Sequence, residues 1–103
     1  MTIKEVTCDG RPIQWDRCPV PRMVDTIKRY VQHGVQPGHF VTAILTNNLS
    51  QSVSRADEEN AAHLVEWVRF LHNYLPTDCH GSIEIVNAWR DERNTSRLEE
   101  VEA

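Results

Sequence analysis

The segment SRADEENAAHLVEWVRFLHNYLP, residues 54–76, decides the fold class, because its apolar residues recur at the three- and four-residue spacing of an α-helix. Ser54 and Asp57 have the spacing of a capping box, although Glu or Gln is the usual second residue. Pro76 disfavours helical backbone at the residue before it, so we expect the helix to end at about Tyr74. One long helix is therefore predicted here.

The apolar arc of this predicted helix is wider than a surface helix needs. It combines two neighbouring stripes, which consist of Leu64, Val68 and Leu71 and of Trp67, Phe70 and Tyr74. Two interpretations follow. Either the helix is central to the fold, or it also faces another subunit, since large exposed apolar patches usually mark interfaces.

Further helices are predicted on both sides of this segment. Residues 22–33 have helical periodicity and precede Gly34, which favours a helix C-cap. Residues 40–45 predict a short helix or a buried strand, which Asn47, Asn48 and Ser50 end. Ser82 is a favourable N-cap for a last helix, whose buried face would consist of Ile85, Val86 and Trp89.

The first residues differ from the rest, because Asp9-Gly10 favours the positive φ angles of a hairpin turn. We expect short strands at 3–8 and 11–15, with Pro12 restricting the second strand to an edge. The predicted fold class is mainly α, a compact bundle of three to four helices with a short N-terminal β-hairpin. The predicted parts are a hairpin or arm at 1–20, a helical domain at 21–92 and a frayed polar tail at 93–103.

Composition excludes several classes of protein. The 103 residues carry a net charge of −4, which argues against non-specific nucleic-acid binding. No apolar run has the length of a membrane span, and the beginning MTIKEVTCDG lacks the apolar core of a signal peptide. Three cysteines at irregular spacing fit a reducing cytoplasm better than a disulfide framework.

Catalytic and metal motifs are not recognisable in the sequence. Cys8 and Cys18 are ten residues apart, and Cys79-His80 has no partner pair, so the ligand spacing of a zinc site is missing. Cys79 could form a nucleophile pair with His72 or His80, but no third group that orients the base can be identified. We therefore predict no enzyme activity, no metal site and no cofactor.

The most informative polar residues lie between positions 30 and 60. The candidate ligand-binding residues are Arg55, Tyr30, His33, Gly38, Phe40, Thr42, Asn47, Asn48 and Asn60. A Pro-Gly turn that opens a helix could hold an anion, Arg55 could bind phosphate, and the aromatic rings could stack on a base. The alternative interpretation assigns the same residues to turns, helix caps and the core.

These residues also carry a resemblance. The runs RYVQHGVQPGHFVTAILTNNL, RADEEN, FLHNYLP and CHGSIEIVNAW resemble a widespread group of small phage- and prophage-encoded proteins, over about residues 22–90. The shared pattern is H-G-x-x-P-G-x-F-L-T-A-V-L-x-N-D-L, then R-A-D-x-x-N, then W-G-S. This chain has Asn48 where Asp is common and His80 where Trp is common. A role that needs a negative charge at position 48 is therefore in doubt.

The resemblance implies a viral accessory protein in the cytoplasm of a bacterial host cell. Such proteins often counter host defence, which gives two hypotheses. The first is an oligomeric binding module, a homo-oligomer that sequesters a cyclic nucleotide or ADP-ribose-type signalling molecule between its subunits. The second is a protein–protein inhibitor or adaptor that binds a host defence protein directly, with an exposed hot spot formed by Trp67, Phe70, Tyr74 or Trp89.

Overall fold

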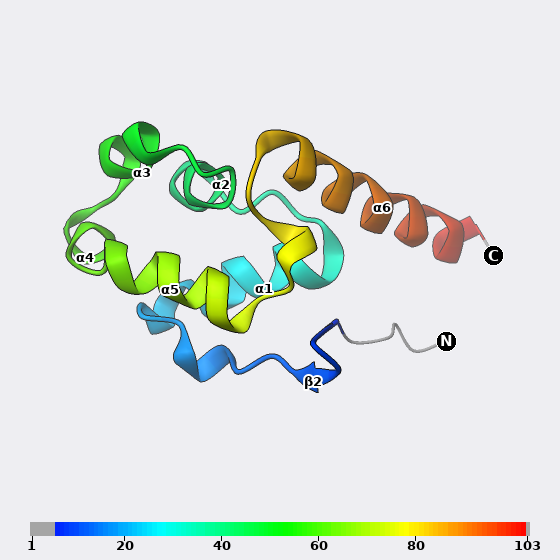
Figure 1. The fold of residues 1–103 in the computed structure, drawn as a ribbon. Helices are drawn as coiled ribbons and strands as arrows, with labels where there is room; N and C mark the ends of the chain where they lie inside the picture. Colours follow the sequence, from blue (N-terminus) through cyan, green and yellow to red (C-terminus); the bar gives the residue numbers. More distant parts are fainter. Residues whose placement is uncertain (1–5, 103) are drawn as a thin grey trace.

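Helices make up most of the structure, a computed structural model that describes residues 6–102, with side chains described as far as Asn94. In this part of the chain there are six α-helices, labelled in Figure 1: α1 (Val24–His33), α2 (His39–Leu45), α3 (Leu49–Arg55), α4 (Glu58–Ala62), α5 (Leu64–Tyr74) and α6 (Ile83–Glu102). Short 3-10 turns are η1 (Trp15–Arg17), η2 (Pro21–Met23) and η3 (Thr77–Cys79). The predicted fold class, mainly α with a short N-terminal hairpin, is confirmed.

The hairpin joins β1 (Thr7–Cys8) to β2 (Arg11–Pro12) in antiparallel register. Asp9 and Gly10 form its turn with φ angles of 53° and 78°, which is the left-handed geometry that a two-residue hairpin turn requires. The strands are shorter than predicted, and residues 3–5 of the predicted first strand lie outside the described residues. The turn was therefore predictable, whereas the strand lengths were not.

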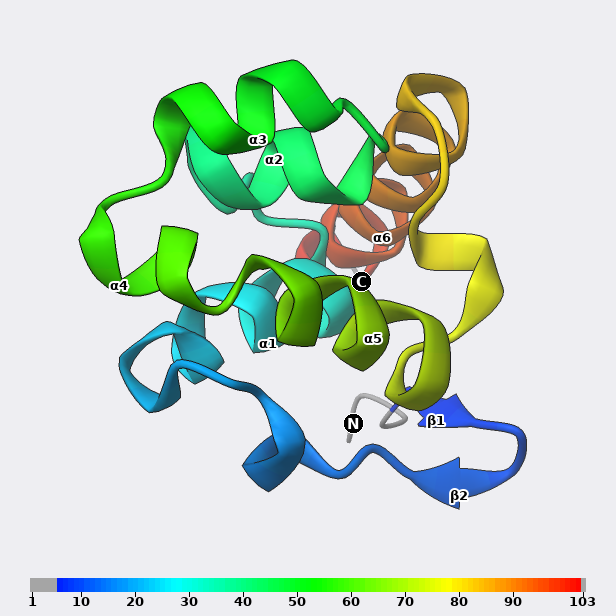
Figure 2. The same cartoon turned by 60° about the vertical axis from the view of Figure 1, so that its left-hand side comes forward.

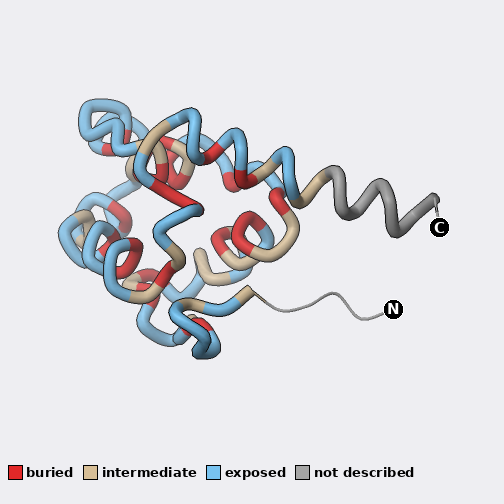
Figure 3. Tube along the Cα trace, turned by 45° about the vertical axis from the view of Figure 1, so that its right-hand side comes forward, coloured by how far each residue is buried: buried red, intermediate tan, exposed pale blue. Residues whose placement is uncertain are grey.

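The helices form two groups around one core. Figure 2 shows α2 and α3 side by side above α1 and α5, with α6 closing one side. Figure 3 shows that buried positions alternate with exposed ones along the helices, so each helix has one side in the core and one in solvent. The buried apolar residues of the helices are Ile27, Tyr30, Val31, Phe40, Val41, Ala43, Ile44, Leu45, Trp67, Phe70, Leu71, Val86 and Trp89.

The loop between α5 and α6 holds the two groups of helices together. The hydroxyl of Tyr30 in α1 donates a hydrogen bond of 2.7 Å to the carbonyl of Cys79. Two residues later, the Gly81 N–H donates to the carbonyl of Leu45 at the end of α2, also at 2.7 Å. Because both bonds come from one short loop, they fix α1 and α2 relative to each other.

The long helix predicted to follow the Ser54/Asp57 cap and to run to about Tyr74 is interrupted at His63, which has a φ of −114°. The turn there lets the Trp67 indole N–H donate to the side-chain oxygen of Asn60 at 3.0 Å. The N-cap is also different from the prediction. Asp57 accepts from the Asn60 N–H at 2.8 Å, while Ser54 belongs to α3. A capping box at Ser54 and Asp57 was therefore a wrong interpretation.

Two further expectations differ from the structure. Val68 is 41% exposed, whereas Leu71 is buried and Leu64 packs against the core, so the predicted core stripe of Leu64, Val68 and Leu71 is wrong at Val68 only. The last helix begins as predicted, since the Ser82 hydroxyl accepts from the Ile85 N–H at 3.2 Å. However, α6 remains helical to Glu102, beyond the point at which a frayed tail was expected.

Candidate functional site

Three of the predicted ligand-binding residues belong to the core. Tyr30 is fully buried, and burial raises the pKa of its phenol above the ordinary value. Phe40 packs edge-to-face on Trp67, with ring centroids 5.8 Å apart. Asn60 is buried and accepts the hydrogen bond from the Trp67 indole. These three side chains stabilise the fold, and none presents a free face to a ligand.

Three others occupy turns or helix termini, and a fourth, Thr42, lies within α2. Asn48 caps α3, because its side-chain oxygen accepts from the Gln51 N–H at 3.1 Å. Asn47 and Gly38 precede helices with positive φ angles of 60° and 94°. The Thr42 hydroxyl is buried in α2 and has no hydrogen-bond partner among the described residues. Since Asn and Asp both cap helices well, the Asn48 cap needs no negative charge.

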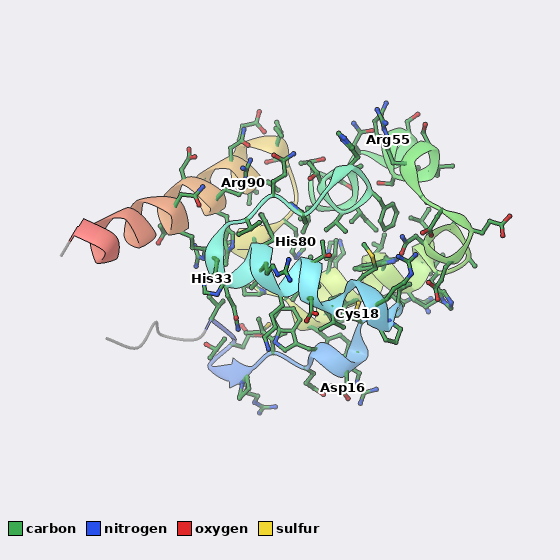
Figure 4. The ribbon with its side chains drawn as sticks, turned by 180° about the vertical axis from the view of Figure 1, so that it is seen from behind. Asp16, Cys18, His33, Arg55, His80 and Arg90 are labelled. Carbon is green, nitrogen blue, oxygen red and sulfur yellow. The ribbon has the colours of Figure 1, made fainter. Side chains whose placement is uncertain are left out.

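The last two predicted residues are far apart. His33 ends α1 and Arg55 ends α3, and Figure 4 shows them well apart. Arg55 is exposed, and among the described residues its Nε makes one long contact, of 3.4 Å, with the side-chain oxygen of Gln51. The nine predicted residues therefore do not converge on one pocket within a single chain.

The RADEEN run has a structural explanation beyond its caps. The Arg22 guanidinium, from η2, forms ion pairs with Asp57 and with Glu59, the latter at 2.6 Å. The pKa of Asp57 is lowered, chiefly by the hydrogen bond from the Asn60 N–H and further by Arg22. These contacts link the beginning of α4 to the segment that precedes α1.

Gly34 has a structural role as well. It adopts a φ of 69° after α1, and a Cβ atom here would lie 2.9 Å from the Arg90 carbonyl oxygen. Two arginines of α6 cover the same helix end, since the Nε of Arg90 donates to the Gly34 carbonyl at 3.4 Å and that of Arg93 donates to the Val31 carbonyl at 3.1 Å. Glycine is thus needed both for its left-handed conformation and for the close approach of α6.

An exposed apolar face on α3 is the feature that sequence reasoning missed. Leu49 is 70% exposed and Val53 is 58% exposed, whereas Ser52 between them is only 2% exposed. The other residues of α3 are all exposed (Figure 3). We call Leu49 and Val53 the α3 face; Arg55 follows Val53 by two positions, which is about 200° around the helix, and so lies outside this face. Two features of the sequence could have indicated this helix face: Asn48 is a favourable N-cap, and Leu49 and Val53 are four residues apart.

The aromatic hot spot expected on the surface is not exposed. Trp67 and Phe70 are buried in the core, and the Trp89 indole N–H donates to the Val31 carbonyl at 3.1 Å. Tyr74 is partly buried and stacks on Phe70. The long aromatic side chains were needed to fill the centre of a small domain. That expectation was therefore wrong for the single chain.

The chemistry of the thiols does not favour nucleophilic catalysis. Cys8, Cys18 and Cys79 are all free, and burial raises the pKa of the Cys79 thiol to about 12. The thiol is therefore protonated at neutral pH and is a weak nucleophile. Within the described residues, no three His, Cys, Asp or Glu side chains gather in a metal-binding group.

An open pocket lies between the hairpin and the end of α5, and its lining is mostly polar: Cys8, Asp9, Arg11, Pro12, Gln14, Asn73 and Tyr74. An enclosed apolar lining, which ligand sites usually have, is absent from this pocket.

None of the helices in the described part of the chain combines the length and apolar character that crossing a membrane requires. Comparison with protein-family models, with curated proteins and with solved structures finds no match.

Proposed function

We propose that the protein is a protein-binding module that contacts its partner through the α3 face. The observation that carries this proposal is the inverted burial of α3, in which Ser52 faces the core while Leu49 and Val53 face solvent. A helix that serves only the fold buries its apolar side chains. Covering the exposed parts of the two side chains would contribute roughly 2–3 kcal/mol to association.

The charge of α3 supports the same proposal. Six of its seven residues are uncharged, and Arg55 is the exception. Depletion of charged residues is typical of the core of a protein interface. We therefore propose a partner with an apolar surface that covers Leu49 and Val53.

A second copy of the chain fits this description poorly. A two-fold symmetric contact presents the same patch from both subunits. The α3 face has two apolar side chains, so a symmetric pair of α3 helices alone would bury less surface than a stable dimer needs. In the phage setting that the resemblance implies, a host defence protein is the partner that we propose.

The test is affinity capture from bacterial host lysate with three versions of the protein. We expect one protein to be enriched by the wild type and by Val65→Ser, a control on α5 that is 59% exposed. The double variant Leu49→Ser/Val53→Ser should lose that partner while keeping its helical circular-dichroism spectrum. Equal enrichment by the double variant, or enrichment of no protein by the wild type, would contradict the proposal.

Sequestration of a nucleotide signal is a second candidate, and the exposure of Arg55 favours it. Its guanidinium makes one long contact with Gln51 and no ion pair within the described residues, so it could bind a phosphate. Because the predicted site residues do not converge within one chain, this function would need pockets between copies in a homo-oligomer. Apolar side chains outside α3, such as Val65 and Val68, could provide contacts between such copies.

Native mass spectrometry with cyclic oligonucleotides and ADP-ribose derivatives tests this candidate. We expect a discrete oligomer that gains a stoichiometric ligand mass in the wild type and in Arg69→Ala, which removes an exposed arginine of α5. Arg55→Ala should lose the ligand and keep the oligomer. A wild type that retains none of these nucleotides, or an Arg55→Ala variant that retains them fully, would count against the candidate.

A further inference from the structure

His80 has an unusual position for a polar side chain. It lies in the loop that holds α1 and α2 together, and only 7% of the residue is exposed. Its Nε2 is buried and has no hydrogen-bond partner among the described residues. A buried polar atom normally has a partner, so this nitrogen is a candidate to bind a group from outside the chain.

The neighbouring side chain is a second imidazole, that of His72 in the last turn of α5. The centroids of the two rings are 5.3 Å apart, and their planes meet at 78°. For a shared tetrahedral metal ion, Zn–N distances are about 2.0–2.1 Å, and each ring centroid lies about 1.2 Å behind its nitrogen, which places two ligating rings about 5.2 Å apart. The observed separation of His72 and His80 allows a shared ion, and it also lies in the ordinary range for a contact between two rings.

The surroundings of His80 also resemble those of a metal ligand. The backbone carbonyl of Leu71, in the last turn of α5, lies close enough to the His80 imidazole to favour its protonated form and so to raise its pKa, against the larger lowering by burial. Histidines that bind metals usually donate their other ring N–H to a carbonyl or carboxylate, which fixes the ring orientation. In His80 this contact with Leu71 coexists with an unpartnered Nε2. Figure 4 labels His80, and the residue is buried.

We propose that His72 and His80 together bind one first-row transition metal ion that prefers imidazole, such as Zn²⁺ or Ni²⁺. Among the described residues no third His, Cys, Asp or Glu joins the pair, so water would occupy the remaining positions of the ion. Imidazole nitrogen suits zinc, copper and nickel, whereas Mg²⁺ and Ca²⁺ prefer oxygen ligands. The proposed site is distinct from the α3 face and does not depend on it.

The test is titration of the tag-free protein with Zn²⁺ by isothermal calorimetry, with Mg²⁺ as the reference metal. We expect Zn²⁺ to bind, and His72→Ala to weaken binding by about tenfold or more, because a ligand is lost. His72 is exposed on a helix, so this substitution should leave the fold intact. The matched control His39→Ala removes another exposed histidine and should bind Zn²⁺ like the wild type.

Histidine NMR spectra of the wild type provide a second measurement that needs no substitution at the buried position. Addition of Zn²⁺ should shift the ring signals of His72 and His80 together and leave those of His39 in place. Binding of no Zn²⁺ by the wild type would overturn the proposal. Unchanged affinity in His72→Ala would overturn it as well, and would reduce the pair to an aromatic contact.

Discussion

Helices α5 and α3 use their apolar residues in opposite ways. In α5 the large residues Trp67, Phe70 and Leu71 are buried in the core. In α3 the buried residue is Ser52, whose hydroxyl donates to the Asn48 carbonyl at 2.7 Å. The first helix is therefore held by burial of apolar surface, and the second by its cap and its packing on α2. Apolar composition alone does not reveal whether a helix serves the fold or a partner.

The largest expected effect comes from truncating the centre of α5. Trp67→Ala should lower the free energy of unfolding by about 3–5 kcal/mol, because it leaves a large cavity. The substitution also removes the indole N–H that pairs with the buried Asn60. Urea denaturation measures the loss, and Val65→Ala on the exposed side of the same helix should change stability by less than about 0.5 kcal/mol. A loss below about 1 kcal/mol in Trp67→Ala would refute the central role of α5.

Asp57 lies between the two regions, and its ionisation should affect their connection. Its folded-state pKa is lowered, chiefly by the Asn60 N–H and then by Arg22. The ionised carboxylate therefore stabilises the fold fully above the unfolded-state pKa of about 3.9. This contribution is lost as the pH falls through the lower folded-state pKa.

We expect the urea midpoint of the wild type to fall on acidification below about pH 4. Asp57→Asn should show a smaller fall, because Asn retains the cap but has no carboxylate to protonate. Asp91→Asn, which changes an exposed acid of α6, should behave like the wild type. Identical acid dependence in the wild type and in Asp57→Asn would show that the ion pair with Arg22 and the capping carboxylate contribute nothing to acid stability.

Features that depend on neighbouring residues in the sequence were predictable. The Asp9-Gly10 turn, the C-cap at Gly34 and the N-cap at Ser82 are all local, and the structure contains each of them. Each depends on backbone conformations that a few side chains favour, so the residue types carried sufficient information.

The predicted site failed as a cluster because its residues are defined by distant contacts. Tyr30 bonds to Cys79, which is 49 positions away, and Phe40 meets Trp67 across the core. Polar and aromatic residues that are close in the sequence were therefore dispersed by tertiary packing. The direction of α3 depended on the same packing, since the caps and spacing indicate a helix but not which side faces α2.

The smallest expected effect tests which side of α3 faces the core and which faces solvent. Val53→Ser replaces a valine of α3 by serine, and Ser52→Val makes the reverse replacement at the adjacent position. Because Val53 is exposed, its replacement should change the free energy of unfolding by less than about 0.5 kcal/mol. Ser52→Val should cost about 1–3 kcal/mol, because it overpacks a buried position and removes the bond to the Asn48 carbonyl. If Val53→Ser proved the more damaging change by urea denaturation, Val53 would belong to the core and the α3 face would not be available to a partner.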